Sequence, residues 1–258
     1  MSRKTTVITG ASSGIGAALA KILGAKDHNL VVAARREQEL RQVAAQSGNH
    51  TVAVVCDVKK RGDMERLKTE ALNEFGQVDI WVNNAGRGIN KKVLDLSDDD
   101  FDEIIDVNLK SAWYGMQVIV PYFQQQKKGH LINISSFLAR VPLVAFRSIY
   151  SASKAALNSL TANLRMDIRA EYPDIHISLV MPGAVTTDFA KNAIGGRPQT
   201  IPIGGIIKPQ TADEVAQAIA SLIDNPQAEI YTNPASPEIA RQYYQDIAAF
   251  EERLRPRK

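Results

Sequence analysis

The chain of 258 residues has a single cysteine, no long hydrophobic run and little net charge. The lone Cys56 excludes an intramolecular disulfide, and its apolar surroundings predict a plain core residue. The longest apolar stretches are strand-sized, far short of the ~20 residues that cross a bilayer, so we expect no integral membrane segment. A formal charge of +3 with dispersed basic residues argues against a nucleic-acid-binding surface.

Other signatures are missing as well. The four histidines, His28, His50, His130 and His176, show no ligand spacing, so we expect no metal site. No Gly-x-Ser-x-Gly segment marks a hydrolase nucleophile. The first residues enter a strand-like run without the apolar region of a signal peptide, which predicts a cytoplasmic protein.

What the sequence does contain is a regular alternation of strand-like and helix-like patterns. Short β-branched runs predict strands at 5–9, 30–34, 51–56, 78–82, 130–134, 176–180 and 229–232. Helical patterns predict helices at about 14–25, 36–47, 60–75, 98–127, 150–171 and 211–224, and a C-terminal helix at about 236–254. Strands that are apolar on both faces indicate a doubly wound parallel sheet of about seven strands with helices on both faces, in a single α/β domain over residues 1–258.

One stretch interrupts this alternation. Residues 192–211 carry four glycines and three prolines without clear periodicity. Long irregular connections in a compact domain are usually functional or mobile loops. We therefore expect a substrate lid at about 189–210.

A glycine-rich turn follows the first predicted strand directly. The segment VITGASSGIG places Gly10, Gly14 and Gly16 between that strand and the first helix. Glycines there allow a tight turn and close approach of the backbone to a pyrophosphate, whose charge the helix N-terminus faces. This context predicts a dinucleotide-binding site.

Tyr150 and Lys154 lie four residues apart within the small-residue stretch IYSASKAA. On a helix the two side chains share one face about a turn apart, so the phenol and the ammonium can influence each other's proton affinity. Taken alone, the pair is compatible with catalysis or with an ordinary surface contact. The other motifs of the chain decide between the two.

Three motifs in this order resemble the short-chain dehydrogenase/reductase superfamily over essentially the whole chain: Thr9-Gly10-x-x-x-Gly14-x-Gly16, Asn83 to Gly86, and Tyr150-x-x-x-Lys154. Further matches are Asp57-Val58, Asn108 in VNL, and Pro182-Gly183. The resemblance implies a Rossmann fold and a nicotinamide-dependent oxidoreductase that acts on CH–OH groups of a small carbonyl or alcohol substrate. It also implies a homodimer or homotetramer formed through the long helices at 98–127 and 150–171.

By this resemblance four residues would form the catalytic site. Tyr150 would be the general acid in reduction and the general base in oxidation. Lys154 would favour the phenolate and bond the nicotinamide ribose, and Asn108 would interrupt its helix and hold a water that links Lys154 to solvent. The fourth residue is a serine at the end of the fifth strand; alignment on the strand selects Ser136, with Ser135 as the alternative.

The second predicted strand bears on the choice of cofactor. An enzyme selective for NAD usually carries an acidic residue about 20 residues after the glycine motif, whereas the 2′-phosphate of NADP needs a cation. Here Ala34 occupies the acidic position, and Arg35 and Arg36 follow it. We therefore predict NADP(H) as the cofactor; the alternative is that both arginines are solvated residues at a helix start.

The expected cofactor contacts follow from the matched motifs. They are Gly10, Ser12, Ser13, Gly14, Ile15, Gly16, Arg35, Arg36, Asp57, Val58, Asn84, Ala85, Gly86, Tyr150, Lys154, Pro182, Gly183, Val185 and Thr187.

The loop after the catalytic serine bears on the substrate. Its apolar residues would either line a cleft for a hydrophobic ketone or aldehyde or pack the loop against the domain; they are Phe137, Leu138, Val141, Leu143, Val144 and Phe146. Arg140 and Arg147 would be an anionic anchor or, more commonly, surface residues. The predicted function is NADPH-dependent reduction of an apolar carbonyl compound. The alternatives are an NADPH-sensing module without turnover and a sugar-nucleotide epimerase or dehydratase, disfavoured by the intact catalytic residues and by the glycine spacing.

Overall fold

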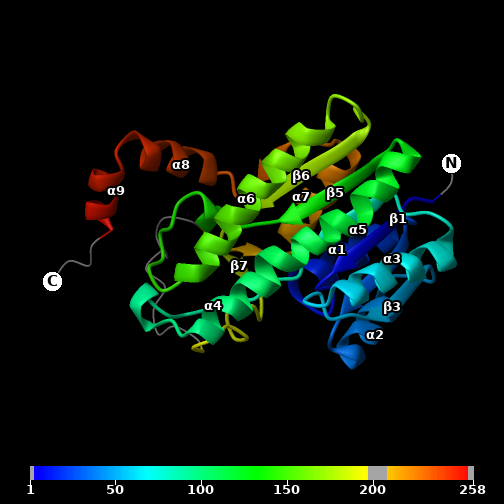
Figure 1. Ribbon diagram of the computed structural model, residues 1–258. Coiled ribbons are helices and arrows are strands. Elements are labelled where there is room, and N and C mark those ends of the chain that lie inside the picture. The colour runs from blue at the N-terminus through cyan, green and yellow to red at the C-terminus, as the bar shows by residue number, and fades with distance from the viewer. Residues whose placement is uncertain (1–2, 197–207, 255–258) are drawn as a thin grey trace.

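The computed structural model describes residues 3–196 and 208–254. Seven parallel strands form one sheet in the order β3-β2-β1-β4-β5-β6-β9 (Figure 1). They are β1 (Thr5–Thr9), β2 (Asn29–Ala34), β3 (Thr51–Val55), β4 (Ile80–Asn83), β5 (Gly129–Ile134), β6 (Ile175–Met181) and β9 (Glu229–Tyr231). The predicted doubly wound parallel sheet is confirmed, and each of its strands lies where the sequence predicts one.

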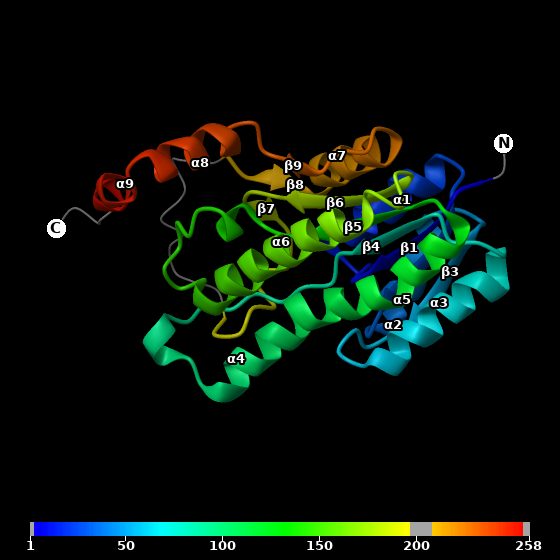
Figure 2. The same cartoon turned by 45° about the horizontal axis from the view of Figure 1, so that its top comes forward.

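Each face of the sheet has its own hydrophobic core. Helices α1 (Gly14–Ala25), α2 (Glu37–Gln46) and α7 (Ala212–Asp224) contribute to one core, and α3 (Arg61–Phe75), α5 (Ser111–Gln126) and α6 (Ser148–Ile168) to the other. Figure 2 shows α7 and α5 on opposite sides of the sheet. In β1, Ile8 packs into the first core and its neighbour Val7 into the second. This alternation explains why the strands are apolar on both faces.

Reciprocal capping pairs fix the start of α4 (Asp98–Ile105) and α7. Ser97 precedes α4 and accepts a hydrogen bond from the amide of Asp100, whose carboxylate accepts one from the amide of Ser97. Thr211 and Glu214 form the same reciprocal pair at the start of α7. Both pairs satisfy amides that have no partner within the helix.

The chain departs from the predicted helices at two places. The helix predicted at 98–127 is a succession of α4, a π-helical turn η2 (Asp106–Lys110) and α5. The single helix predicted at 236–254 is wrong: α8 (Ser236–Gln245) and α9 (Ile247–Arg253) are separate, because Asp246 has an extended backbone with φ −156°. Its carboxylate accepts a hydrogen bond from the amide of Ala249 at 2.9 Å and so caps α9.

Four short elements have no counterpart in the predictions. Two are 3₁₀ turns, η1 (Val93–Asp95) and η3 (Phe137–Ala139). The other two are the paired strands β7 (Val185–Thr186) and β8 (Gln210–Thr211). Of the lid predicted at 189–210, residues 197–207 lie outside the described part of the chain.

A third, smaller core lies beyond the carboxyl ends of the strands, where α8 and α9 are placed (Figures 1 and 2). We call it the satellite core; it joins the loop after β5 to the two C-terminal helices and consists of Phe137, Val141, Leu143, Val144, Ile239, Ala240, Tyr243 and Phe250. The loop that follows the candidate catalytic serine is therefore anchored by the C-terminal helices.

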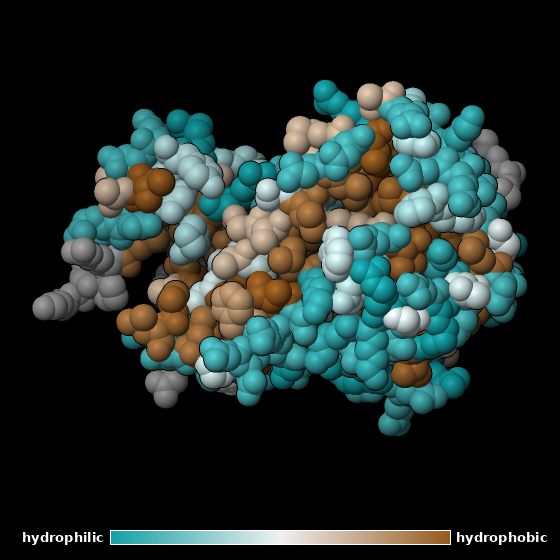
Figure 3. Space-filling model, in the orientation of Figure 1, coloured by the Kyte–Doolittle hydropathy of each residue, from teal (hydrophilic) through white to brown (hydrophobic). Residues whose placement is uncertain are grey.

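On the molecular surface, apolar side chains form a band over α5 and α6 in the space-filling view (Figure 3). A shallow hollow of about 300 Å³ lies between these two helices. None of the helices among the described residues is long and apolar enough to cross a membrane.

Candidate active site

A cleft of about 770 Å³ opens at the carboxyl ends of β1, β4, β5 and β6. The strand order reverses between β1 and β4, which is where open α/β sheets bind their ligands. All predicted cofactor and catalytic residues line this cleft except Gly16 and Asn108, which are buried. The fold thus brings residues from the whole length of the chain to one place.

The glycine turn after β1 packs directly against the loop after β4. Gly10 has φ +67°, a conformation that favours glycine, and a Cβ there would lie 2.7 Å from Cα of Ala85. A Cβ on Gly16 would lie 2.6 Å from Nδ2 of Asn84. Asn84 Nδ2 also donates to the backbone oxygen of Thr9 at 2.9 Å and of Gly10 at 3.2 Å. The glycine turn after β1 and the loop after β4 therefore pack closely together, without room for a side chain at Gly10 or Gly16.

The start of α1 is open to an anion. Its N-cap Ser13 makes no side-chain hydrogen bond to the helix amides, and the first turn holds no acidic residue. Gly14, with φ +58°, faces the loop after β6, and a Cβ there would lie 3.4 Å from Cγ2 of Thr187. Unpaired amides at a helix N-terminus favour a phosphate group, so these residues fit the pyrophosphate of a dinucleotide.

Two arginines follow β2 at the edge of the cleft. Arg36 Nη2 donates to the hydroxyls of Ser12 at 2.9 Å and Ser13 at 2.7 Å, while Nη1 contacts Glu39 at 3.4 Å. Arg35 is exposed and also lines the cleft. The position before them is Ala34, so this corner of the site presents guanidinium groups where a carboxylate would repel a phosphate.

Lys154 is a buried cation in the lining of the cleft. It is 4% exposed, and its Nζ donates to the backbone oxygen of Ile134 at 2.8 Å. No carboxylate among the described residues pairs with it. Burial lowers the pKa of Lys154 from 10.5 to about 8, because the charged form loses its hydration.

Tyr150 lines the cleft one helical turn before Lys154. Burial raises the pKa of Tyr150 above its usual 10.0, while the Ser136 hydroxyl and the Arg147 guanidinium act in the opposite direction. The phenol is therefore protonated at neutral pH. The Phe189 ring meets the tyrosine ring edge to face, with centroids 5.6 Å apart.

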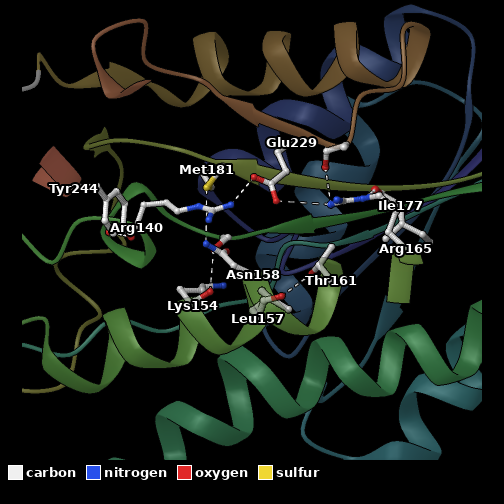
Figure 4. Close-up of polar contacts among 12 residues, drawn as sticks. Arg140, Lys154, Leu157, Asn158, Thr161, Arg165, Ile177, Met181, Glu229 and Tyr244 are labelled. Carbon is white, nitrogen blue, oxygen red and sulfur yellow. Dashed lines mark hydrogen bonds and ion pairs between the residues drawn. The ribbon is translucent and has the colours of Figure 1, made fainter. Parts of the chain in front are cut away.

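The two candidate serines have different surroundings. Ser135 Oγ donates to Asn158 Oδ1 at 2.5 Å, so its hydroxyl proton is already engaged in a buried hydrogen bond. Figure 4 shows Asn158 beside Met181, whose sulfur accepts from Asn158 Nδ2 at 3.9 Å. Ser136 Oγ accepts from the amide of Leu138 at 3.1 Å, and its hydroxyl lies in the cleft beside the Tyr150 phenol, whose pKa it lowers. This geometry favours Ser136 as the group that contacts a substrate carbonyl.

Asn108 lies in the π-helical turn η2, a type of turn that is frequent at functional sites. Its Oδ1 accepts from the amide of Arg87 at 2.8 Å, and its Nδ2 donates to the oxygen of Arg87 at 3.0 Å and to Ser153 Oγ at 3.2 Å. A Cβ on Gly86 would lie 3.4 Å from Asn108 Oδ1 and 3.7 Å from Lys154 Nζ. Asn108 and Lys154 thus border the same glycine.

The loop after β5 forms the apolar side of the cleft. The residues that line it as predicted are Phe137, Leu138, Leu143, Val144 and Phe146. Val141 does not line it and is buried in the satellite core instead. Both roles expected of this loop are therefore present: one face of the loop lines the cleft, and the other face packs into the satellite core.

Two arginines of this loop differ in their placement. Arg140 Nη2 contacts Glu229 Oε2 at 2.5 Å. Figure 4 marks this ion pair with a dashed line, and Arg140 is not part of the cleft lining. Arg147 lines the cleft and is only 8% exposed, so the expectation of a surface residue is wrong for it. Phe189, which contacts both Tyr150 and Arg147, carries no motif that predicts it.

Cys56 is buried, and its burial raises the pKa of the thiol to about 12, as expected for an unreactive core residue. Residues 3–196 and 208–254 contain no cluster of three or more His, Cys, Asp or Glu side chains that could hold a metal ion.

Comparison with known proteins bears on the chemistry of this cleft. The family model described as short chain dehydrogenase matches residues 4–197. An uncharacterized oxidoreductase of Staphylococcus saprophyticus is 32% identical over 229 residues, which cover 87% of this chain and 91% of that protein. One from Staphylococcus aureus is 36% identical over 185 residues, covering 71% of this chain and 79% of the other.

Three solved structures share the fold at 26–28% identity. A short chain dehydrogenase/reductase from Burkholderia phymatum in complex with NAD has a TM-score of 0.86 at 27% identity, covering 96% of this chain and 95% of that chain. An alcohol dehydrogenase from Thermococcus sibiricus complexed with 5-hydroxy-NADP has a TM-score of 0.77 at 28% identity, covering 90% and 97%. A 3-ketoacyl-(acyl-carrier-protein) reductase from Brucella melitensis complexed with NADH has a TM-score of 0.79 at 26% identity, covering 90% and 98%.

Proposed function

This chain belongs to the short chain dehydrogenase family, and from that premise we propose that it reduces a carbonyl compound with NADPH and oxidises the corresponding alcohol in the reverse direction. One observation carries the proposal. The protonated phenol of Tyr150 lies in one cleft with the hydroxyl of Ser136 and one turn from the buried ammonium of Lys154. A general acid, a hydrogen-bond donor and a fixed positive charge are what carbonyl reduction needs from a protein.

The bound nicotinamide would supply the hydride, with its pyrophosphate at the start of α1. Ser136 would donate a hydrogen bond to the substrate carbonyl oxygen and hold it beside the hydroxyl of Tyr150. Tyr150 would then give its proton to that oxygen as negative charge develops there. Lys154 keeps a positive charge one turn away, held by Ile134, and this charge would stabilise the tyrosinate that remains.

The NADP(H) part of the proposal is supported by the corner after β2, where Arg35 and Arg36 follow Ala34. NADPH and NADH are titrated against the protein by fluorescence quenching. A charge-assisted contact to the 2′-phosphate is worth about 1.5–3 kcal/mol, so NADPH should bind roughly tenfold to hundredfold more tightly. Arg35→Ala should remove most of this difference, whereas Arg41→Ala, which removes an exposed guanidinium paired with Glu37, should leave it intact. Equal affinities in the unmodified protein would contradict the NADP(H) assignment.

The substrate part of the proposal is an apolar ketone or aldehyde, supported by the apolar loop after β5. A diverse panel of carbonyl compounds is assayed by NADPH oxidation, with the corresponding alcohols and NADP⁺ in the reverse direction. Turnover of hydrophobic carbonyls is the expected result. Turnover of free sugars alone would reject the apolar cleft, and cofactor binding without any turnover would favour a sensing module.

We also propose that the protein is cytoplasmic and assembles into a homodimer or homotetramer through α5 and α6. The surface between these helices supports the assembly: the hollow there is lined by apolar residues such as Trp113, Met116, Val120 and Leu164. Figure 3 shows the apolar band that such an interface would bury.

A further inference from the structure

Arg147 places a guanidinium group in the catalytic cleft without a carboxylate to balance it. The residue is 8% exposed and precedes α6, three positions before Tyr150. Its Nη1 donates a long hydrogen bond to the backbone oxygen of Ile89, at 3.4 Å. No Asp or Glu of the described part of the chain forms an ion pair with Arg147, and residues 1–2, 197–207 and 255–258 include no Asp or Glu.

Two nearby arginines do have acidic partners, and Arg35, which also lines the cleft, is exposed to solvent. Arg87, which lines the cleft, contacts Glu103 at 2.5 Å. Arg140, in the same loop as Arg147, contacts Glu229 at 2.5 Å, and Figure 4 shows the two side chains extended toward each other. Arg147 therefore differs from Arg87 and Arg140, because its buried guanidinium has no acidic partner among the described residues.

Packing holds the guanidinium of Arg147 beside the reacting groups. A Cβ on Gly88 would lie 2.6 Å from Arg147 Nη1, so the absence of a side chain there leaves room for it. The centroid of the Phe189 ring lies 5.9 Å from Cζ of Arg147 and 5.6 Å from the centroid of the Tyr150 ring. One aromatic ring thus contacts both the cation and the candidate general acid.

A buried cation without a counterion is costly, because the protein does not replace the water that the charge has lost. Burial lowers the pKa of Arg147, which is the direction that this cost predicts. A guanidinium stays charged in a protein and offers paired N–H groups that match the two oxygens of a carboxylate. An anion that enters the cleft would supply the missing counterion.

We propose that Arg147 binds a carboxylate of the substrate, so that the preferred substrates are oxo acids whose apolar part lies against the loop after β5. This inference rests on the proposed function for the reduction step only. Carboxylate recognition itself is a binding property and is testable without turnover.

Calorimetry on the complex of the protein with oxidised cofactor tests the binding. The probes are phenylacetate, 3-phenylpropanoate and 4-phenylbutanoate, each compared with its methyl ester, so that the spacing between ring and carboxylate varies. For at least one length, the acid should bind about tenfold or more tightly than the ester. Arg147→Gln should abolish this preference and Arg147→Lys should retain part of it, whereas Arg140→Gln, a matched control, should retain it in full.

Kinetics on 2-, 3- and 4-oxo acids and their methyl esters then give the ratio of kcat/KM for acid over ester. The ratio should exceed one in the unmodified protein, through KM, and fall to about one in Arg147→Gln. A merely structural role of Arg147 would lower the values for acid and ester by the same factor and leave the ratio unchanged, which would overturn the inference.

The two proposals fail separately. If esters bind and react as well as acids in the unmodified protein, the carboxylate inference is overturned while the reductase function stands. If acids bind preferentially through Arg147 but no carbonyl compound is reduced, carboxylate recognition stands and the reductase function is rejected.

Discussion

Replacing Lys154 with methionine should make the protein without cofactor more stable at neutral pH, although it removes a candidate catalytic group. The lysine is 4% exposed, and its ammonium donates a hydrogen bond to the backbone oxygen of Ile134 at 2.8 Å. Burial lowers its pKa from 10.5 to about 8. Methionine fills similar space without a charge.

The pKa difference sets the size of the effect. At 1.36 kcal/mol per pKa unit, a fall from 10.5 to about 8 corresponds to about 3 kcal/mol of destabilisation in the charged state. Loss of the hydrogen bond to Ile134 offsets about 1 kcal/mol of the gain. The net gain of about 2 kcal/mol should raise Tm by roughly 4–8 °C in a domain of this size.

The gain depends on pH with a defined sign. Below about pH 8 the lysine is protonated in the folded and the unfolded states, so the full cost of the buried charge is present. Between about pH 8 and 10.5 the unfolded chain keeps a proton that the folded protein releases, so the stability of the unmodified protein rises with pH. The advantage of methionine should therefore shrink over this range and vanish above it.

Thermal unfolding followed by circular dichroism, at a series of pH values between about 6.5 and 9.5, measures this difference. Lys21→Met on α1 is the control, because that lysine is exposed and its charge remains hydrated. A Lys154→Met protein that is less stable than the unmodified one at neutral pH would refute the reasoning. So would an advantage that grows as the pH rises.

Three further outcomes are expected. Tyr150→Phe should bind cofactor nearly normally and lose almost all reductase activity, because it removes the proton donor alone; more than a small residual turnover would contradict that role. Ser136→Ala should lower kcat far more than Ser135→Ala, whereas Ser135→Ala should lower Tm through the lost hydrogen bond to Asn158; equal losses of kcat would leave Ser136 without its assigned role. Light scattering at micromolar concentration should show a dimer or tetramer, and a monomer alone would count against assembly through α5 and α6.

The sheet and the cofactor side of the cleft are predictable because their constraints are local. A strand buried on both faces consists mostly of apolar and β-branched residues, as β1 and β4 do, so its place in the sequence is clear. The turn after β1 needs φ > 0 at Gly10 and no side chain at Gly16, and glycine alone meets both needs. Tyr150 and Lys154 are related by helical spacing within a single helix.

The features that the sequence left open or did not predict depend on contacts between distant parts of the chain. Ser135 and Ser136 both follow β5, and only the packing of α6 decides that Ser135 bonds to Asn158. Arg147 is buried because the loop after β4 covers it, through a contact with Ile89, 58 positions away. The break at Asp246 could not be predicted, because the helical pattern of the sequence continues through this residue. In the structure the Asp246 side chain caps α9, and this local hydrogen bond replaces a continuous helix.

The satellite core is separate from the two cores that flank the sheet. Groups of residues that pack among themselves open in local fluctuations that leave the rest of a protein folded. Amides of α8 and α9 should accordingly exchange hydrogen for deuterium sooner than those of β1, β4 and β5. In the proposed function, substrate would enter and product would leave on the side of the C-terminal helices, while the glycine turn after β1 would stay folded around the dinucleotide.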